Sequence, residues 1–413
     1  MALNRGLGTP RTAVLAIVTT LVLVPAMWGQ AKYRSLYRFT NGKDGASPVA
    51  GLIFDQAGNL YGTAWGGGAY QYGVVFRLTP NSDGRWTEKV LHSFTGREDG
   101  GNPQAGLVFD RAGNLYGTTT QGGAHHCDCG VVFELTQNAD GKWKEKVLHS
   151  FTGGDSDGAA PTDRPIFDSS GNLYGTASNG GNNDFGVVFK LTPNSDGSWT
   201  ETVIHYFASG NDGAYPRSGL IPDEAGNLYG TTSYGGTYGG GTVFKMKPHS
   251  DGTWTESVLY AFQNEGESPV AGLIFDSAGN LYGTTPVLIG GEGFGIAFEL
   301  TPNSDGTWTE RVLYRFCSLT RCPDGSYPGG LIFDRAGNLY GTANGGGDGG
   351  YGVVFKLTPR KDGGWEETVV HAFLDHPGAD PHVGMILDTT GNLYGTTAGD
   401  GGYTFGSVFE FTP

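Results

Sequence analysis

The sequence has 413 residues, of which 73 are glycine and only 16% are charged, and its formal net charge is −15. Aromatic residues make up 12% of the chain, so there is apolar surface to bury, and the excess of glycine indicates frequent turns rather than disorder. A protein this acidic repels phosphate backbones, which argues against nucleic acid as a partner.

The N-terminal segment has the pattern of a secretory signal peptide. Arg5 and Arg11 give a positively charged start, an apolar stretch covers residues 13–24, and Gly29-Gln30-Ala31 offers small residues for cleavage. The apolar stretch is shorter than the roughly 20 residues of a membrane span, although an uncleaved anchor is the alternative. We therefore predict a signal peptide over residues 1–31 and a secreted chain, extracellular or periplasmic, over residues 32–413, with no membrane span.

One hexapeptide, Gly-Asn-Leu-Tyr-Gly-Thr, dominates the rest of the chain. It occurs seven times, at intervals of 53–58 residues. Its first glycine falls at Gly58, Gly113, Gly171, Gly226, Gly279, Gly337 and Gly391. A fixed interval of this size is typical of repeat architectures, in which each repeat is one supersecondary unit.

The first repeat predicts four short strands. Apolar runs cover residues 51–55, 59–63, 73–78 and 86–94, and Asp83-Gly84 suits the hairpin turn before the last run. No segment shows the 3.6-residue period of a helix. Four strands per repeat predict an all-β fold, a seven-bladed β-propeller with four-stranded antiparallel blades. Small residues ahead of the first strand, such as Ala50-Gly51, are expected to suit a crowded axis.

The two ends of the chain predict how the ring closes. The seventh repeat stops at Pro413, after its third strand, and residues 33–39 match the fourth strand of other repeats, such as residues 89–94. The N-terminal strand can therefore complete the last blade. A linear solenoid of sheets is the alternative, but it would leave open strand edges, which a closed ring removes.

The sequence set Gly-Leu-Ile-Phe-Asp (51–55), Gly-Asn-Leu-Tyr-Gly-Thr (58–63) and Gly-Val-Val-Phe-Lys-Leu (186–191) resembles the GloVer tandem-repeat family of secreted bacterial proteins. The resemblance covers essentially the whole chain after the signal peptide. It implies export and a repeat domain, and it carries no assigned activity.

The loops differ in kind between the two ends of each predicted sheet. The first turn and the Asp-Gly hairpin share one end and hardly change between repeats. The second-to-third loops and the blade-to-blade crossovers share the other end, which we call the variable face, and variable loops on a rigid scaffold often carry function. Aromatic side chains there suit sugar rings or protein anchors, with packing of blade edges as the alternative. The ligand-binding candidates are Trp65, Tyr70, Tyr234, Tyr238, Tyr351 and Tyr403.

The crossovers carry a repeated Asp-Gly pair. Its acids are Asp44, Asp99, Asp157, Asp212 and Asp324. A ring of carboxylates could bind calcium or a cationic ligand, but repetition favours a role in which each aspartate caps its own turn. No other cofactor is predicted. Histidine and tyrosine exchange at one fourth-strand position, as in His92 and Tyr314, which favours packing over catalysis there.

The four cysteines fall in two places. Cys317 and Cys322 are predicted to form a disulfide, which an exported protein can keep. His125, His126, Cys127 and Cys129 together form a soft-metal ligand set. Thiols outside the cell tend to oxidise, which weakens the metal hypothesis, and a bridge between neighbours two residues apart is strained.

Short catalytic motifs occur without the structure that they require. The stretch 154–158 fits Gly-x-Ser-x-Gly but lies in a crossover with no helix. The leading hypothesis is a monomeric extracellular binding or interaction scaffold for a glycan or protein ligand. The alternatives are a secreted carbohydrate-active enzyme, a hydrolase or lyase using acids such as Asp348 or Asp400, and a purely structural surface protein.

Overall fold

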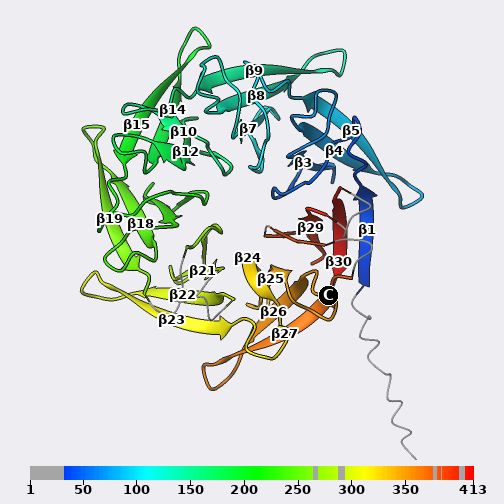
Figure 1. Ribbon diagram of the computed structural model, residues 1–413, viewed down its shortest axis with the longest axis vertical. Helices are drawn as coiled ribbons and strands as arrows, with labels where there is room; N and C mark the ends of the chain where they lie inside the picture. Colours follow the sequence, from blue (N-terminus) through cyan, green and yellow to red (C-terminus); the bar gives the residue numbers. More distant parts are fainter. Residues whose placement is uncertain (1–31, 264–267, 287–293, 375–378, 383, 400–404) are drawn as a thin grey trace, which may run out of the picture. The chain divides into compact units, whose positions relative to one another are not determined.

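The computed structural model describes residues 32–413 except 264–267, 287–293, 375–378, 383 and 400–404. These residues form a seven-bladed β-propeller of four-stranded antiparallel sheets, as the sequence predicted (Figure 1). The described part of the chain holds no helix of the length and apolarity that a membrane span requires. The predicted signal peptide lies outside the described residues and stays a prediction.

The blades follow the chain in order, and each begins with its inner strand, which is two residues long in every blade except the sixth. The first is β2 (Ile53–Phe54), β3 (Leu60–Ala64), β4 (Val74–Pro80) and β5 (Trp86–Ser93). The second is β6 (Val108–Phe109), β7 (Leu115–Thr119), β8 (Val131–Gln137) and β9 (Trp143–Ser150). The third is β11 (Ile166–Phe167), β12 (Leu173–Ala177), β14 (Val187–Pro193) and β15 (Trp199–Tyr206). The fourth is β16 (Ile221–Pro222), β17 (Leu228–Thr232), β18 (Thr242–Pro248) and β19 (Trp254–Ala261).

The remaining blades keep the same order. The fifth is β20 (Ile274–Phe275), β21 (Leu281–Thr285), β22 (Ile296–Pro302) and β23 (Trp308–Arg315). The sixth is β24 (Ser326–Phe333), β25 (Leu339–Gly345), β26 (Val353–Pro359) and β27 (Trp365–Ala372). The seventh is β28 (Ile386–Leu387), β29 (Leu393–Thr397), β30 (Ser407–Thr412) and β1 (Lys32–Arg38). A two-stranded ladder, β10 (Gly158–Ala159) with β13 (Asn179–Gly180), joins a crossover to a second-to-third loop.

The N-terminal strand closes the ring. β1 pairs antiparallel with β30, from Lys32 opposite Thr412 to Arg38 opposite Ser407, and Figure 1 shows the two strands side by side. Just after β1, the ring of Phe39 is fully buried and meets Phe76 of the first blade at 5.1 Å between centroids. The predicted closure is confirmed, and it gives the last blade the same four strands as the other six.

The hexapeptide is explained by contacts within its own blade. In the first blade, the carboxylate of Asp55 accepts hydrogen bonds from the backbone N–H of Asn59 at 2.9 Å and from the hydroxyl of Tyr61 at 3.1 Å. Leu60 is fully buried. A Cβ at Gly62 would lie 2.8 Å from the ring of Phe76, so that position excludes any side chain.

The threonine of the hexapeptide links neighbouring blades. Its hydroxyl is buried and donates to a backbone carbonyl in the short segment just before the first strand of the next blade, a segment that we call the inlet of that blade. Each of these hydrogen bonds satisfies a buried acceptor. The pairs are Thr63 to Ala105, Thr118 to Asp163, Thr176 to Ser218, Thr231 to Pro269, Thr284 to Gly329 and Thr396 to Ala50. The last pair spans the closure, so the same hydrogen bond stabilises the ring there as elsewhere.

Candidate functional site

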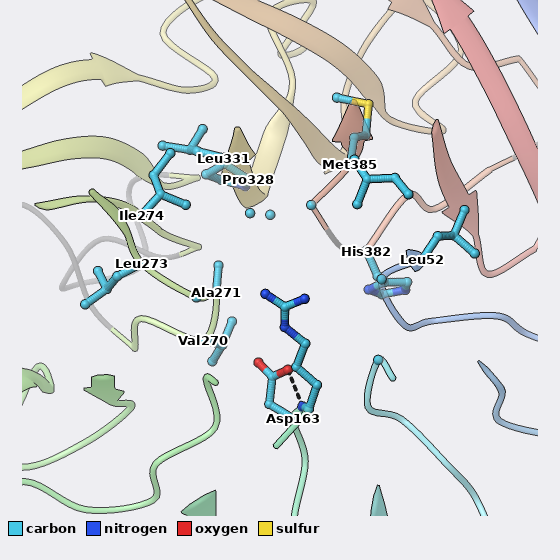
Figure 2. Close-up of a pocket in the computed structure, with 18 of the residues that line it drawn as sticks. Leu52, Asp163, Val270, Ala271, Leu273, Ile274, Pro328, Leu331, His382 and Met385 are labelled. Atoms are coloured by element: carbon cyan, nitrogen blue, oxygen red, sulfur yellow. Dashed lines mark hydrogen bonds between the residues drawn. The ribbon is translucent and has the colours of Figure 1, made fainter. Parts of the chain in front are cut away.

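A hollow lies where the first strands of several blades converge. Its lining comes from the segments just before these strands, and Figure 2 shows residues of different blades, among them Leu52, Asp163, Leu273 and His382, around one space. The inner part has a volume of about 460 Å³. A wider part of about 800 Å³ shares several lining residues with it and reaches Trp65 in a second-to-third loop. We call the two parts together the hollow.

The hollow opens on the variable face. Its wider part is lined both by crossover residues, such as Val49 and Arg217, and by residues that follow the second strand, such as Trp65 and Ser178. The two kinds of loop are joined by backbone bridges, for example between Ala46 and Gly66. The prediction that these loops share one end of the sheets is thereby confirmed.

One position at the hollow is glycine in six blades and arginine in the third. The glycines are Gly51, Gly106, Gly219, Gly272, Gly330 and Gly384, and the arginine is Arg164. The expectation of a crowded axis holds for Gly330, where an added Cβ would lie 3.1 Å from the backbone of Gly384. It is wrong for Gly51 and Gly272, where a Cβ would meet no atom within 4 Å.

Asp163 holds the inlet of the third blade against that of the fourth. One carboxylate oxygen accepts the N–H of Arg164 at 2.6 Å, and the other accepts the N–H of Gly219. Burial raises the pKa of this carboxyl, although the nearby guanidinium of Arg164 and the two N–H groups work in the opposite direction. Asp163 therefore lines the hollow with a carboxyl group whose orientation is fixed by backbone.

Two cationic side chains line the hollow together with this carboxyl. Arg164 lines the inner part of the hollow and Arg217 the wider part, and both side chains are exposed. The hydroxyl of Thr162 donates to the carbonyl of Arg217 at 3.3 Å, which joins the two inlet segments. Within the described part of the chain, neither guanidinium group has a hydrogen-bond or ion-pair partner.

His382, from the seventh blade, lines both parts of the hollow. The amide nitrogen of Asn344 lies 3.1 Å from its Nε2. Partial desolvation in the hollow lowers the pKa of His382, although the negative charge of Asp380 works in the opposite direction, so the neutral form of the ring is favoured.

The structure places the predicted aromatic residues differently from one another. Trp65 lines the hollow with 42% of its surface exposed. Tyr70, Tyr234 and Tyr238 are more than half exposed but do not belong to the lining as described. Tyr351 packs against a core cluster that includes Phe373. Tyr403, like Asp400, lies outside the described residues.

Sequence reasoning missed Asp163, Arg164, Arg217 and His382. A signal for them was present, because six of the seven blade inlets read Pro followed by a short segment that ends in Gly. Aligning the seven inlets exposes Arg164 as the single departure from glycine. It also shows that the residue after the proline varies, as Arg217 and His382 do.

A second cluster of polar groups lies at the interface between the second and third blades. Potential ligand atoms of His149, Asp157 and Glu201 all lie within 4.8 Å of one another. His149 Nε2 is 3.2 Å from Asp157, whose carboxylate also accepts the N–H groups of Thr152 and Gly158. Desolvation and the negative charge of Asp157 raise the pKa of Glu201 to about 7.

The same arrangement recurs around the ring with tyrosine in place of histidine. Tyr37 donates to Asp44 at 3.1 Å, and Tyr314 donates to Asp324 at 2.9 Å. The crossover aspartates also accept backbone N–H groups, which is the turn role that the sequence favoured. Since tyrosine serves equally well, the cluster at His149 is explained by turn capping and packing. The calcium hypothesis stays a prediction.

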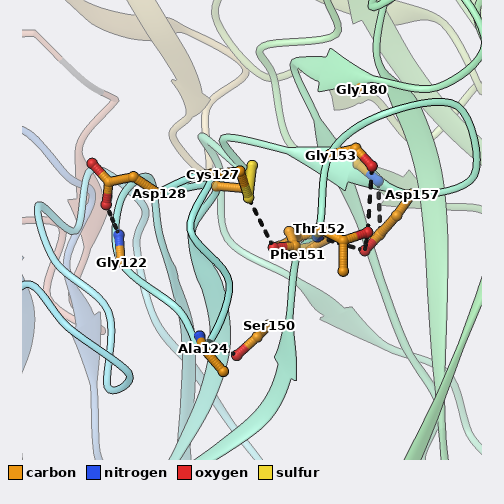
Figure 3. Close-up of a disulfide and its surroundings, with 12 residues drawn as sticks. Gly122, Ala124, Cys127, Asp128, Ser150, Phe151, Thr152, Gly153, Asp157 and Gly180 are labelled. Atoms are coloured by element: carbon orange, nitrogen blue, oxygen red, sulfur yellow. Dashed lines mark hydrogen bonds between the residues drawn. A yellow bond between two sulfur atoms is a disulfide. The ribbon is translucent and has the colours of Figure 1, made fainter.

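The structure joins both cysteine pairs in disulfides, Cys317 with Cys322 and Cys127 with Cys129. Figure 3 shows the second pair beside the crossover that carries Asp157. With both sulfurs oxidised, neither cysteine offers a thiolate, and His125 and His126 are exposed on the same loop. The metal site expected at these four residues stays a prediction.

The repeat of a known family matches the chain three times, over residues 27–233, 128–322 and 223–413. The chain belongs to the Gloeobacter/Verrucomicrobia repeat family. The resemblance inferred from the repeated hexapeptide is thus confirmed. Among curated proteins, none matches this member of the Gloeobacter/Verrucomicrobia repeat family significantly.

Solved structures similar to this Gloeobacter/Verrucomicrobia repeat protein share its fold at low identity. One is the extracellular domain of a proposed one-component system, BT4673, from B. thetaiotaomicron, with a TM-score of 0.54 and 13% identity over 92% of this chain. Another is an ancestral GH74 enzyme, with a TM-score of 0.56 and 12% identity over 89% of this chain. The chain covers 42% and 48% of these two structures, less than half of each. At this identity the likeness shows the fold alone.

Proposed function

We propose that this chain is an exported binding protein that holds a glycan in the hollow on its variable face. The lining of the hollow carries the proposal. The repeated residues are used by the scaffold, whereas the hollow is lined by unlike side chains from different blades, among them Trp65, Gln104, Arg217 and His382. Concave sites of several hundred Å³ with a few convergent polar groups are the usual form of small-ligand sites.

The chemistry of the lining suits a sugar. Trp65 offers a flat apolar ring, and sugar rings pack on such faces. Gln104, Thr120 and Ser178 offer amide and hydroxyl groups that can exchange hydrogen bonds with sugar hydroxyls. The glycines at Gly51 and Gly272 leave open space beside them.

Three observations support export. The N-terminal segment has the pattern of a signal peptide. Both cysteine pairs are disulfides, and these persist in oxidising compartments. A solved structure of similar fold is described as an extracellular domain.

The proposal is tested by measuring glycan binding to the purified chain on an array and then by calorimetry. We expect Trp65→Ala to weaken binding at least ten-fold. Tyr238→Ala is the matched control, because Tyr238 is 55% exposed and lies outside the described lining. Equal affinity of the Trp65→Ala variant and the wild type would contradict the proposed site.

Release of cleaved products in the same assay would instead favour the carbohydrate-active enzyme. Among the described lining residues only Asp163 bears a carboxyl group, whereas most glycoside hydrolases use two. A protein ligand, which the sequence also allowed, would be indicated by capture of a protein without any glycan binding.

A further inference from the structure

The hollow has the opposite charge to the chain as a whole. The chain carries 41 acidic and 26 basic residues. Among the described lining residues, the charged groups are the carboxyl of Asp163 and the guanidinium groups of Arg164 and Arg217. A positive hollow in a strongly negative protein concentrates field on a negative ligand.

Arg164 has no counterpart at this position in the other blades. The equivalent residue there is glycine, and the scaffold contacts of the inlet do not require a side chain. The backbone of this segment is held by Asp163, which accepts the N–H groups of Arg164 and Gly219, and by the hydrogen bond from Thr118 to the Asp163 carbonyl. The guanidinium of Arg164 is thus placed in the hollow by a fixed inlet without being used to hold it.

Asp163 does not cancel both cations. Its two oxygens already accept backbone N–H groups. Arg217 comes from the neighbouring blade and lines the wider part of the hollow, on the same side of the ring as Thr162 and Asp163. The described lining of the hollow therefore carries two exposed guanidinium groups from adjacent blades and one carboxyl group, which leaves a net positive charge.

We propose that the hollow selects acidic glycans, whose carboxylate or sulfate group binds Arg164 and Arg217. This inference rests on the proposed function and names the substrate class for the same site. Guanidinium groups present forked N–H donors that match planar anions and bind them with charge-assisted hydrogen bonds. Trp65 and the neutral polar residues of the lining then contact the sugar rings.

The test compares four oligosaccharides by calorimetry with the full exported chain. They are an oligogalacturonate, its methyl ester, a sulfated galactan oligosaccharide and a neutral galactan oligosaccharide. We expect binding of the oligogalacturonate or of the sulfated sugar at least ten-fold tighter than binding of the methyl ester and the neutral sugar. The two acidic sugars distinguish a carboxylate from a sulfate ligand. The affinity should fall as salt is added, because the interaction is ionic.

Two variants assign the effect to these residues. Arg164→Gly installs the residue of the other blades, and Arg217→Val installs the residue found at Val270; each should weaken acidic-glycan binding at least ten-fold. Arg111→Gln is the matched control, since it removes the same charge from a first turn, at the opposite end of the sheets, and installs the residue found at Gln56. Its affinity should equal that of the wild type.

The outcomes separate this inference from the proposed function. Equal binding of acidic and neutral glycans, unaffected by Arg164→Gly, would overturn the inference and leave the binding function standing. Acidic preference that Arg111→Gln weakens as much as Arg164→Gly would also overturn it, because the effect would then come from net charge. Binding of no glycan would contradict both.

Discussion

The hollow at the axis and the interfaces between blades are built from the same seven repeats. Residues recur from blade to blade at the interfaces, whereas they vary at the hollow. At the interfaces, the same residue makes the same contact around the ring, as Thr63 and Thr396 do when they donate to the next inlet. At the hollow, the residue after the inlet proline changes from blade to blade. These residues are Val49, Gln104, Thr162, Arg217, Val270, Gly329 and His382. The difference teaches that the repeated positions hold the scaffold, whereas the changing positions line the hollow in which we propose that a ligand binds.

The interface between the sixth and seventh blades keeps its close packing although one of its residues differs from those in the other blades. There β1 supplies Tyr33 where other blades have glutamate, and its ring stacks on His371 at 4.3 Å and 1° between planes. Burial lowers the pKa of His371 to about 4, so this ring is neutral at pH 7. A tyrosine therefore occupies the place of the glutamate at this interface, and the packing between the blades is kept.

The largest effect should follow from opening the closure. Phe39→Ala removes a fully buried ring that packs on Phe76, and we expect it to destabilise the fold by about 3–5 kcal/mol in urea unfolding. Phe94→Ala is the matched variant inside the continuous chain, where the ring meets Phe133 at 5.2 Å. Equal costs would show that the closing joint is as tight as any other. A Phe39→Ala cost below about 1 kcal/mol would contradict closure by the N-terminal strand.

A smaller effect should follow from cutting one link between blades. Thr176→Val keeps the shape of a 2% exposed side chain but removes its donor to the carbonyl of Ser218, 3.1 Å away. A buried acceptor without a partner costs about 1–2 kcal/mol, which denaturant unfolding can measure. Thr202→Val, at an exposed position of the same blade, is the control and should cost nothing. A neutral Thr176→Val would mean that water or another donor replaces the link.

The sequence predicted the scaffold because the scaffold repeats. Seven copies of the hexapeptide determine strands, turns and blade number together, and the match of residues 33–39 to a fourth strand determines closure. The turn role of the crossover aspartates followed from the same regularity. These predictions rest on several copies of the repeat, so a departure in one blade does not change them.

The hollow could not be predicted in the same way. Trp65 could be predicted because an aromatic residue in a loop is noticeable by itself. Arg164 is noticeable only when the equivalent positions of the repeats, which are 53–58 residues apart, are aligned and the others prove to be glycine. Whether the axis is crowded or open depends on how close the inlets approach, and periodicity does not report that distance. Gly330 and Gly272 read alike in sequence, yet only the first faces backbone within 4 Å.

The stability of the interface between the second and third blades should depend on pH. The pKa of Glu201 is raised to about 7, chiefly by burial and then by Asp157, so the folded state binds this proton more tightly than the unfolded state. Its stabilising contribution is therefore complete below about pH 4.5 and is lost as the pH rises through about 7. Glutamine mimics the protonated form. We expect Glu201→Gln to stabilise the fold at pH 8 by about 1 kcal/mol, allowing for solvent screening of a partly exposed group, and to change little at pH 5.

Urea unfolding at pH 5 and pH 8 measures this difference. The pH should stay above about 4, because the pKa of Asp157 is lowered and its own contribution disappears in stronger acid. Glu366→Gln is the control, since Glu366 is exposed on β27. A Glu201→Gln variant that is less stable than the wild type at pH 8 would show that the ionised carboxylate, rather than the acid, is the form that the interface favours.

The smallest effect on stability should come from Arg164, one of the residues that we propose to bind the ligand. Arg164→Gly replaces an exposed side chain, whose guanidinium has no partner among the described residues, by the residue that six other inlets use. The hydrogen bonds that hold the inlet come from the backbone of Arg164 and from Asp163, and both survive the change. We therefore expect the free energy of unfolding to change by less than about 0.5 kcal/mol. A loss of 2 kcal/mol or more would place Arg164 with the scaffold and would make weaker glycan binding by this variant a consequence of a disturbed inlet. If the free energy of unfolding is unchanged and the affinity for the glycan is lost, Arg164 contributes to binding and not to the scaffold.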